Sequence, residues 1–205
     1  MTSPHYRLVY FNARGRAEHI RFIFAHAGVE YEDVRVTREQ WAEMKQSTPF
    51  GALPVLEVDG RQAAQSAAIA RFLARRLGLA GDDDWAALQC DALVDALADL
   101  KQALFQWRAE TEPAQKEARK RELMRDTVPF YLGRFERIVA ENGGYAVAGQ
   151  LTWADFMFAV SLENFELLFG SRALEAYPSL RALKERVFSL PRIQAWVQRR
   201  PVTEF

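Results

Sequence analysis

Two groups of residues in this sequence have the chemistry to bind or stabilise an anion. Gln65 and Ser66 precede a stretch with apolar residues at helical spacing, so Ser66 is expected at the start of a helix. The free N–H groups and positive dipole end of a helix N-terminus suit a carboxylate. The alternative is that Ser66 only caps its own helix. The second group is Tyr10, Arg14 and Arg16, because a hydroxyl and a guanidinium both stabilise an anion. The alternatives are a core aromatic for Tyr10, solvated charges for both arginines, and an ion pair of Arg14 with Glu18 four residues on.

A short helix and a proline-containing loop are two further candidate parts of a binding site. Thr37 and Gln40 form a capping-box pattern, which predicts a short helix carrying Trp41 and Lys45 four residues apart on one face. An indole N–H and an ammonium group on one face can bind a carboxylate, although Trp41 also fits a surface residue packed on its neighbours. Pro54 lies in a loop, and the peptide bond before a proline is the only kind that readily adopts the cis form.

Metal and thiol chemistry find little support in the sequence. The histidines, which are His5, His19 and His26, have no metal-ligand spacing. The single cysteine, Cys90, excludes an internal disulfide and a multi-cysteine metal site, and it fits a reducing compartment. We therefore expect no metal, and we expect Cys90 to be a buried helix residue.

The composition excludes several classes of function. The chain has 205 residues, of which 49% are hydrophobic, and its 27 basic and 27 acidic residues cancel. A neutral chain lacks the basic face of a dedicated nucleic-acid binder. No apolar run approaches the roughly 20 residues that span a bilayer. The N-terminus also lacks the basic and apolar segments of a signal peptide, so we expect a cytoplasmic protein with no membrane or nucleic-acid partner.

The first part of the chain predicts alternating strands and helices. Strands are expected over residues 7–11 and 31–36, with helices over residues 16–27 and after residue 37. A hairpin follows, with strands over 55–58 and 61–64 joined by Asp59-Gly60, a type I′ turn signal. A helix from Ser66 completes the order β-α-β-α-β-β-α. This order predicts an α/β thioredoxin-like domain, because strands separated by a helix require a parallel crossover and the hairpin adds an antiparallel edge.

The rest of the chain predicts only helices, after a polar linker. The expected helices cover residues 84–107, 113–142 with a kink at Pro129, 152–168, 179–188 and 191–198. We therefore predict two domains, residues 1–79 and an all-α domain over residues 85–205. Their charges are opposite, +3 up to residue 79 and −3 in the remainder.

Four motifs in this order resemble those of sigma-class glutathione transferases. They are the YFNARGRAE segment from Tyr10, the PFGALPVL loop from Pro49, the QSxxIxRxL helix start from Gln65 and the LTWADF segment from Leu151. The resemblance covers essentially the whole chain. It implies the glutathione transferase fold, with a glutathione-binding first domain and a second domain that holds the electrophile pocket.

The resemblance also assigns roles to single residues. The Tyr10 hydroxyl is expected to donate a hydrogen bond to the glutathione sulfur, with Arg16 as the nearby guanidinium. The backbone of Leu53, before a cis Pro54, is expected to pair with the cysteinyl backbone like an added strand. The remaining glutathione contacts are the γ-glutamyl carboxylate at Gln65 and Ser66, the glycyl carboxylate at Trp41 and Lys45, and the loop backbone at Gly51 and Ala52.

Two positions depart from the family pattern. Relatives often carry a pair of acids where this chain has Ala98-Asp99, and one acid crosses a dimer interface to the partner's glutathione amine. The single Asp99 leaves two readings, a contact to the partner's site in a homodimer or a solvated helix charge. It also disfavours an interface metal. The second departure is Ala52, which stands where some relatives have lysine, so this chain has no charged side chain at that position.

The resemblance predicts a glutathione S-transferase of the detoxifying type, which activates the glutathione thiolate for attack on an electrophilic, apolar second substrate. Two alternatives stay open: a glutathione-dependent prostaglandin-type isomerase, and a non-catalytic glutathione- or ligand-binding protein. The second-substrate pocket is expected among loop and helix residues Asn12, Ala13, Phe105, Gln106, Trp107 and Phe205. Phe50 is expected either to approach a partner subunit or to cap its own core.

Overall fold

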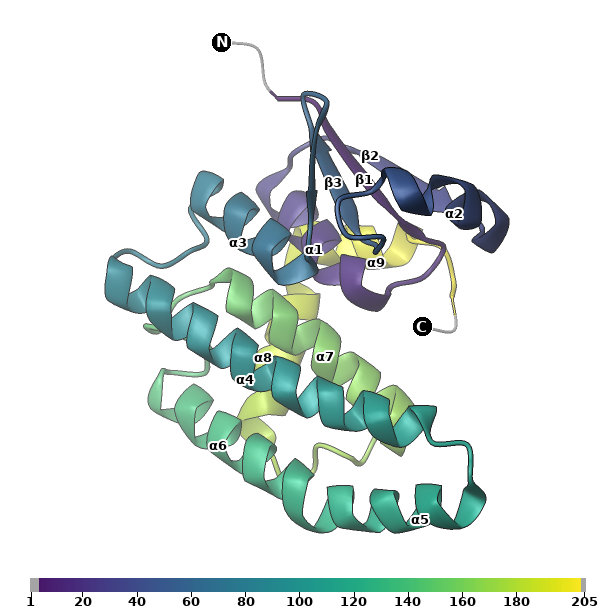
Figure 1. The fold of residues 1–205 in the computed structure, drawn as a ribbon. Helices are drawn as coiled ribbons and strands as arrows, with labels where there is room; N and C mark the ends of the chain where they lie inside the picture. Colours follow the sequence, from purple (N-terminus) through teal and green to yellow (C-terminus); the bar gives the residue numbers. More distant parts are fainter. Residues whose placement is uncertain (1–3, 204–205) are drawn as a thin grey trace. The chain divides into compact units, whose positions relative to one another are not determined.

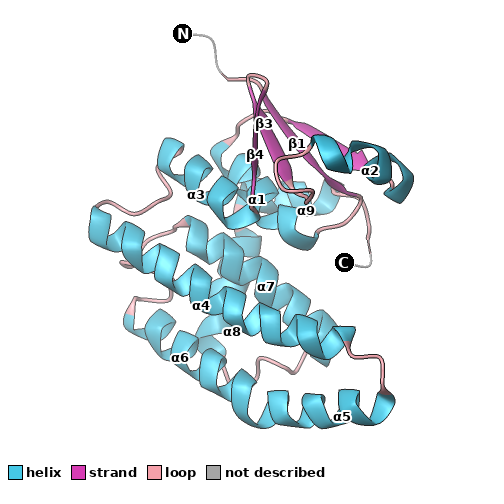
Figure 2. Ribbon diagram, in the orientation of Figure 1, coloured by secondary structure: helices cyan, strands magenta, loops and turns pink. Residues whose placement is uncertain are grey.

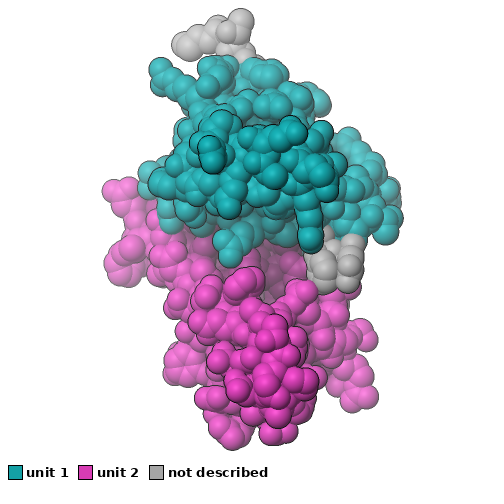
Figure 3. Space-filling view, turned by 45° about the vertical axis from the view of Figure 1, so that its right-hand side comes forward, with its two compact units in different colours: residues 1–79, 187–205 teal, residues 80–186 magenta. Residues whose placement is uncertain are grey.

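The computed structural model describes residues 4–203, and the predicted elements are present with boundaries shifted by one or two residues (Figures 1 and 2). The chain divides into two compact units (Figure 3). Unit 1 comprises Met1–Leu79 and Val187–Phe205, and unit 2 comprises Ala80–Arg186. The predicted fold class, an α/β first part followed by an all-helical second part, is confirmed.

Unit 1 contains a four-stranded mixed sheet with strand order β2-β1-β3-β4. Its elements are β1 (Tyr6–Phe11), the short 3₁₀ turn η1 (Gly15–Ala17), α1 (Glu18–Ala27), β2 (Glu32–Val36), α2 (Arg38–Met44), the 3₁₀ turn η2 (Lys45–Ser47), β3 (Val55–Val58), β4 (Arg61–Ala64), α3 (Ser66–Arg76) and α9 (Pro191–Arg199). β1 pairs in parallel with β2, as the crossover argument predicts, and β3 pairs antiparallel with β4, as the hairpin argument predicts. β1 also pairs antiparallel with β3, which the sequence patterns do not predict.

The two faces of the sheet are covered by different helices. Val9 and Val55 form an apolar cluster into which Trp41 of α2 packs. Tyr6 projects from the opposite face, because its position differs from that of Val9 by an odd number of residues, and it contacts Phe24 of α1 at 5.2 Å between ring centroids. α2 and α1 therefore cover opposite faces (Figure 1). α1 also packs against α3 and α9.

Local sequence signals account for the ends of several elements. Asp59 and Gly60 both have positive φ, as the predicted type I′ turn requires. Gly28 ends α1 in the left-handed conformation. Thr37 and Gln40 make both hydrogen bonds of the predicted capping box at the start of α2.

The last helix differs from the expected arrangement. Residues 187–205 belong to unit 1, whereas the sequence places them in an all-helical domain over residues 85–205. Trp196 of α9 donates a buried hydrogen bond to Glu18 of α1 at 2.9 Å, and Phe188 contacts Phe22 of α1 at 5.4 Å between ring centroids. These contacts join segments that are more than 160 residues apart, which sequence periodicity does not detect. The two-domain division itself stays a prediction.

The named secondary-structure elements of unit 2 are all helices. They are α4 (Asp84–Ala109), α5 (Pro113–Glu122), the π-helical turn η3 (Leu123–Thr127), α6 (Val128–Glu141), α7 (Trp153–Phe169) and most of α8 (Pro178–Ser189). The irregularity expected at Pro129 takes the form of η3, which directly precedes α6. Proline has no N–H to donate to the carbonyl of residue i−4, so it disturbs the α-helical hydrogen bonding there.

Buried polar groups fix the start of α7. Asp155 accepts hydrogen bonds from the main-chain N–H groups of Ala146 and Thr152, both at 2.8 Å. Burial raises the pKa of the Asp155 carboxyl, and these hydrogen bonds oppose that rise. The capping box that Thr152 and Asp155 form is thus a folding element in the interior of unit 2.

Candidate functional site

The register of the sheet brings three of the sequence motifs to one end of unit 1. Val55 at the start of β3 lies opposite Val9 of β1 and also opposite Ala64 of β4. The residues next to these three are Tyr10, Pro54 and Gln65. Because β1, β3 and β4 are neighbours in the sheet, these residues lie side by side at the same end of the strands.

Tyr10 is held by the turn that follows β1. Its hydroxyl oxygen accepts a hydrogen bond from the main-chain N–H of Arg16 at 3.0 Å. Gly15, which precedes Arg16, has φ +42°, and a Cβ atom there would lie 2.5 Å from the Tyr10 hydroxyl oxygen. The close approach therefore requires glycine. The Arg16 side chain is exposed, so this contact to Tyr10 uses its backbone and leaves its guanidinium on the surface.

The loop before β3 contains the predicted cis bond. The Leu53–Pro54 peptide is cis, and Leu53 packs against the apolar cluster that includes Val55. Gly51 has φ +56°, and a Cβ atom built there would lie 3.6 Å from Cε of Lys45. Ala52 is exposed. The loop thus places exposed backbone beside the edge of the sheet that carries Tyr10.

The start of α3 differs in detail from the expectation for Ser66. Gln65 is the N-cap, with φ +73°, and its side chain makes no capping hydrogen bond. Ser66 is the first helical residue, so its predicted role as N-cap is wrong. The first backbone hydrogen bond of the helix runs from the Ile69 N–H to the Gln65 carbonyl at 2.9 Å. The N–H groups of the residues between them remain available at the helix end, and Ser66 is half-buried there.

Trp41 and Lys45 lie one helical turn apart, although α2 ends at Met44. Lys45 keeps a helical backbone, and its N–H bonds to the Trp41 carbonyl. Trp41 is half-buried and contacts Phe11 edge to face at 6.1 Å between ring centroids. Lys45 is exposed. The expectation that Trp41 packs on its neighbours therefore holds alongside any role in binding.

Other predicted residues belong to unit 2 or lie outside the described residues. Asp99 is exposed on α4. Phe105 is also exposed, and Trp107 stacks on Phe169 at 5.3 Å between ring centroids. Phe205 is outside the described range. The predicted glutathione contacts of unit 1 are thus gathered at one end of its sheet, and the Asp99 contact stays a prediction.

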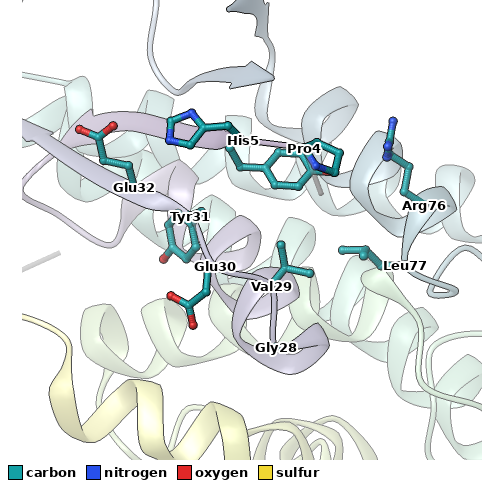
Figure 4. A pocket seen from close by; sticks show the side chains of 10 residues that line it. Pro4, His5, Gly28, Val29, Glu30, Tyr31, Glu32, Arg76 and Leu77 are labelled. Atoms are coloured by element: carbon teal, nitrogen blue, oxygen red, sulfur yellow. The ribbon is translucent and has the colours of Figure 1, made fainter. Parts of the chain in front are cut away.

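A cavity of about 780 Å³ opens at the other end of the same sheet (Figure 4). It is lined by residues at the start of β1 and β2 and at the ends of α1 and α3, including His5, Glu30, Tyr31 and Arg76. None of the predicted site residues lines it. We place the candidate site at the Tyr10 end, because the available donors and exposed backbone converge there.

Comparisons with known proteins identify the family. Residues 7–75 match the glutathione S-transferase N-terminal domain, and residues 98–200 match the glutathione S-transferase C-terminal domain. Glutathione S-transferase S1 of Drosophila melanogaster is 42% identical over 199 residues, which cover 97% of this chain and 80% of that protein. The chain belongs to the glutathione S-transferase family. Its activity is that of a glutathione S-transferase, and glutathione is the family's co-substrate.

Solved structures of the family agree with the fold. The structure of prostaglandin synthase D of Nilaparvata lugens superposes with a TM-score of 0.92 at 40% identity, covering 98% of this chain and 100% of that one. A monomeric glutathione S-transferase of the hookworm Necator americanus gives a TM-score of 0.89 at 36% identity, covering 98% and 100% of the two chains. The predicted glutathione transferase fold is therefore confirmed.

Sequence reasoning missed the buried charges behind Tyr10. Glu18 and Arg21 are completely buried in α1 and form an ion pair at 3.1 Å. The only sequence signal is their spacing of three residues inside an apolar helix. The role of Gly15 was also missed, since its close contact involves Tyr10 on a different element.

The remaining expectations concern the thiol, metal ligands and membrane-spanning segments. Cys90 is buried, and burial raises the pKa of its thiol, which fits the expected inert helix residue. Within residues 4–203, no three His, Cys, Asp or Glu side chains are grouped as a metal site. No helix in that range combines the length and the apolar character needed to cross a bilayer.

Proposed function

We propose that Tyr10 activates the glutathione thiol in this glutathione S-transferase. A free thiol with pKa about 8.5 is only a few per cent ionised at pH 7. Lowering that pKa by two units takes about 2.7 kcal/mol of stabilisation of the thiolate. The observation that supports Tyr10 is its hydroxyl oxygen, which accepts the Arg16 N–H at 3.0 Å. With that oxygen engaged as an acceptor, the hydroxyl proton is free to donate to a sulfur anion.

Arg16 is proposed to add positive charge near the sulfur. Its guanidinium is exposed at the same turn, and glutathione would cover it on binding. A cation close to a thiolate favours the charged form, and the effect grows as water is excluded. The thiolate then attacks an electrophilic carbon of the second substrate, forming the carbon–sulfur bond as the leaving group departs or the electrophile takes up the electron pair.

The rest of glutathione is proposed to bind along the edge of the sheet. Leu53 offers its backbone to the cysteinyl residue, with the backbone of Gly51 and Ala52 beside it. The N-terminus of α3, at Gln65 and Ser66, binds the γ-glutamyl carboxylate through free N–H groups and the Ser66 hydroxyl. Trp41 and Lys45 bind the glycyl carboxylate at the opposite end of the tripeptide.

We propose a sigma-class enzyme that works in the cytoplasm as a homodimer, with a detoxifying role. The four sequence motifs support the class, and the single cysteine supports a reducing compartment. Phe50 is 70% exposed, and Trp85 and Leu88 on α4 are 67% and 54% exposed. Such exposed apolar side chains favour a protein interface. In the dimer, Asp99 contacts the amine of the partner subunit's glutathione.

A second candidate function is isomerisation of a prostaglandin endoperoxide. The likeness to prostaglandin synthase D of Nilaparvata lugens favours it. The exposed Phe105 and the half-buried Trp107 provide aromatic surface in unit 2 for an apolar substrate. Both activities use the same thiolate, but conjugation retains glutathione in a new carbon–sulfur bond, whereas isomerisation releases it unchanged.

The test is a screen of the purified protein with glutathione against a panel of electrophiles and a prostaglandin endoperoxide. We expect conjugation of at least one electrophilic carbon compound that depends on Tyr10. Turnover of the endoperoxide alone would favour the isomerase. Retention on glutathione resin without any turnover would contradict both and leave a binding protein.

A further inference from the structure

An ionic cluster centred on a fully buried ion pair contacts the turn after β1 within unit 1. The side chains of Arg21 and Glu18 have zero exposure, and Arg21 Nη1 donates to Glu18 Oε2 at 3.1 Å. Arg21 Nε donates to Asp33 Oδ1 of β2 at 3.0 Å. Burying such charges requires desolvation that their attraction only partly offsets, so a buried pair is weak evidence for a stabilising role. Its contacts indicate another role.

Arg21 reaches directly into the turn that holds Tyr10. Its Nη1 atom donates to the Ala13 carbonyl at 2.7 Å. Its guanidinium carbon lies 5.9 Å from the centroid of the Tyr10 ring. Ala13 lies between Tyr10 and Arg16, whose N–H binds the Tyr10 hydroxyl. One side chain therefore contacts both the ring of Tyr10 and the turn that fixes its hydroxyl.

A second arginine holds the neighbouring residue of the same turn. Arg35 Nη1 donates to the Asn12 side-chain carbonyl at 3.0 Å. Asp33 lies between the two arginines, with Oδ1 on Arg21 Nε and Oδ2 on Arg35 Nε, both at 3.0 Å. Asn12 and Ala13 are thus tied to β2 through Asp33, which sets the path of the turn relative to the sheet.

The cluster also contacts the end of the chain. Glu18 Oε1 accepts the Trp196 indole N–H at 2.9 Å and Arg200 Nη1 at 2.9 Å. Both donors come from α9 or the residue after it. Arg21 and Glu18 therefore link the last helix of the chain to the turn that follows the first strand.

We propose that Arg21 is a positioning residue for the Tyr10 hydroxyl, and that Trp196 and Arg200 of the C-terminal segment hold Arg21 in place through Glu18. This inference rests on the proposed role of Tyr10 in glutathione activation. Arg21 acts by fixing the Ala13 carbonyl and hence the turn. Its planar guanidinium donates to three acceptors, which lie in the turn after β1, on α1 and on β2.

The first variant is Arg21→Lys, which keeps the positive charge and loses the planar guanidinium with its several N–H donors. One ammonium group cannot reach the Ala13 carbonyl, Glu18 and Asp33 in the same geometry. We expect kcat to fall about 100-fold, the effect of roughly 1 Å of misplacement at a reacting group. The Kd for glutathione measured by calorimetry should change less than about tenfold, because most of its contacts are elsewhere.

Arg7→Lys is the matched control. Arg7 also pairs with two carboxylates, Glu32 and Glu57, across strands of the same sheet. Those two carboxylates lie on β2 and β3, away from the turn after β1. We expect wild-type kcat and Kd for this variant.

A milder variant covers the case in which Arg21→Lys does not fold. Trp196→Phe removes one hydrogen bond to Glu18 and keeps an aromatic ring in α9. We expect kcat to fall in this variant too, but by less, about tenfold.

Hydrogen exchange of the Arg16 amide provides a readout without glutathione. In the wild type this amide is bound to the Tyr10 hydroxyl, and in Arg21→Lys and Trp196→Phe we expect exchange faster by about tenfold or more. Faster exchange with lower kcat supports the proposal. Faster exchange with unchanged kcat supports the positioning of Tyr10 and contradicts its role in turnover. Unchanged exchange of the Arg16 amide in the folded variants overturns the positioning role, whatever happens to kcat.

Discussion

The hydroxyl oxygen of Tyr10 accepts a hydrogen bond from the main-chain N–H of Arg16 at 3.0 Å, across the glycine that separates Arg16 from Arg14. This contact fixes the direction of the hydroxyl group. A fixed donor stabilises a developing or resident anion better than a freely rotating one, because no reorganisation is needed when the charge is present. The geometry of this turn therefore determines how well Tyr10 can serve a thiolate.

Gly15→Ala tests whether this turn matters for turnover. The added Cβ would lie 2.5 Å from the Tyr10 hydroxyl oxygen, so the ring must move. We expect kcat to fall about 100-fold. Gly60→Ala is the control, since Gly60 also has positive φ and no atom lies within 4 Å of a Cβ built there. Equal kcat for the two variants, measured at saturating glutathione, would contradict the importance of the Tyr10 contact.

Ser66→Ala tests the carboxylate site at the start of α3. Loss of a charge-assisted hydrogen bond should weaken glutathione binding by about 1–3 kcal/mol. Calorimetry gives the Kd directly. Ser179→Ala, in the first turn of α8 in unit 2, should leave the Kd unchanged. If Ser66→Ala binds glutathione as tightly as the wild type, the hydroxyl takes no part in binding.

Much of unit 1 follows from local sequence patterns. Asp59-Gly60, the Thr37–Gln40 capping box and the glycine after α1 act within a few residues, so periodicity and turn chemistry locate them. Tyr10, Pro54 and Gln65 lie at or next to the ends of strands that the sequence locates, but the strand order and register that bring them together come from the structure. The structure adds contacts between distant segments, such as Trp196 with Glu18. No local pattern encodes such a pairing.

The assembly is tested by sedimentation at low micromolar concentration. We expect a species of twice 23.5 kDa, about 47 kDa. In that dimer, Asp99→Asn should weaken glutathione binding about tenfold, or about 1.4 kcal/mol, through loss of a charge contact to the amine. Asp95→Asn, one turn earlier and also exposed, should bind normally. A mass near 23.5 kDa at every concentration would contradict both the dimer and the Asp99 contact.

The pH dependence of stability should include a contribution from His26. Burial and then the neighbouring Arg192 lower the pKa of this half-buried histidine in the folded state. The unfolded chain therefore binds the proton more readily, and stability should decrease as pH falls below the ordinary histidine value of about 6.5. His26→Gln should flatten this decrease in urea-unfolding midpoints between pH 7 and 5. The exposed His5→Gln is the comparison, and an equal slope for both variants would contradict the assignment.

The most direct test of thiol activation is a titration of bound glutathione, followed by the ultraviolet absorbance of its thiolate, in the wild type and in Tyr10→Phe. The wild type should give an apparent thiol pKa about two units below the free value of about 8.5. Tyr10→Phe should return the pKa toward about 8.5 and lower kcat at neutral pH, with the Kd for glutathione little changed. The same thiol pKa in both proteins would contradict the role of the Tyr10 hydroxyl.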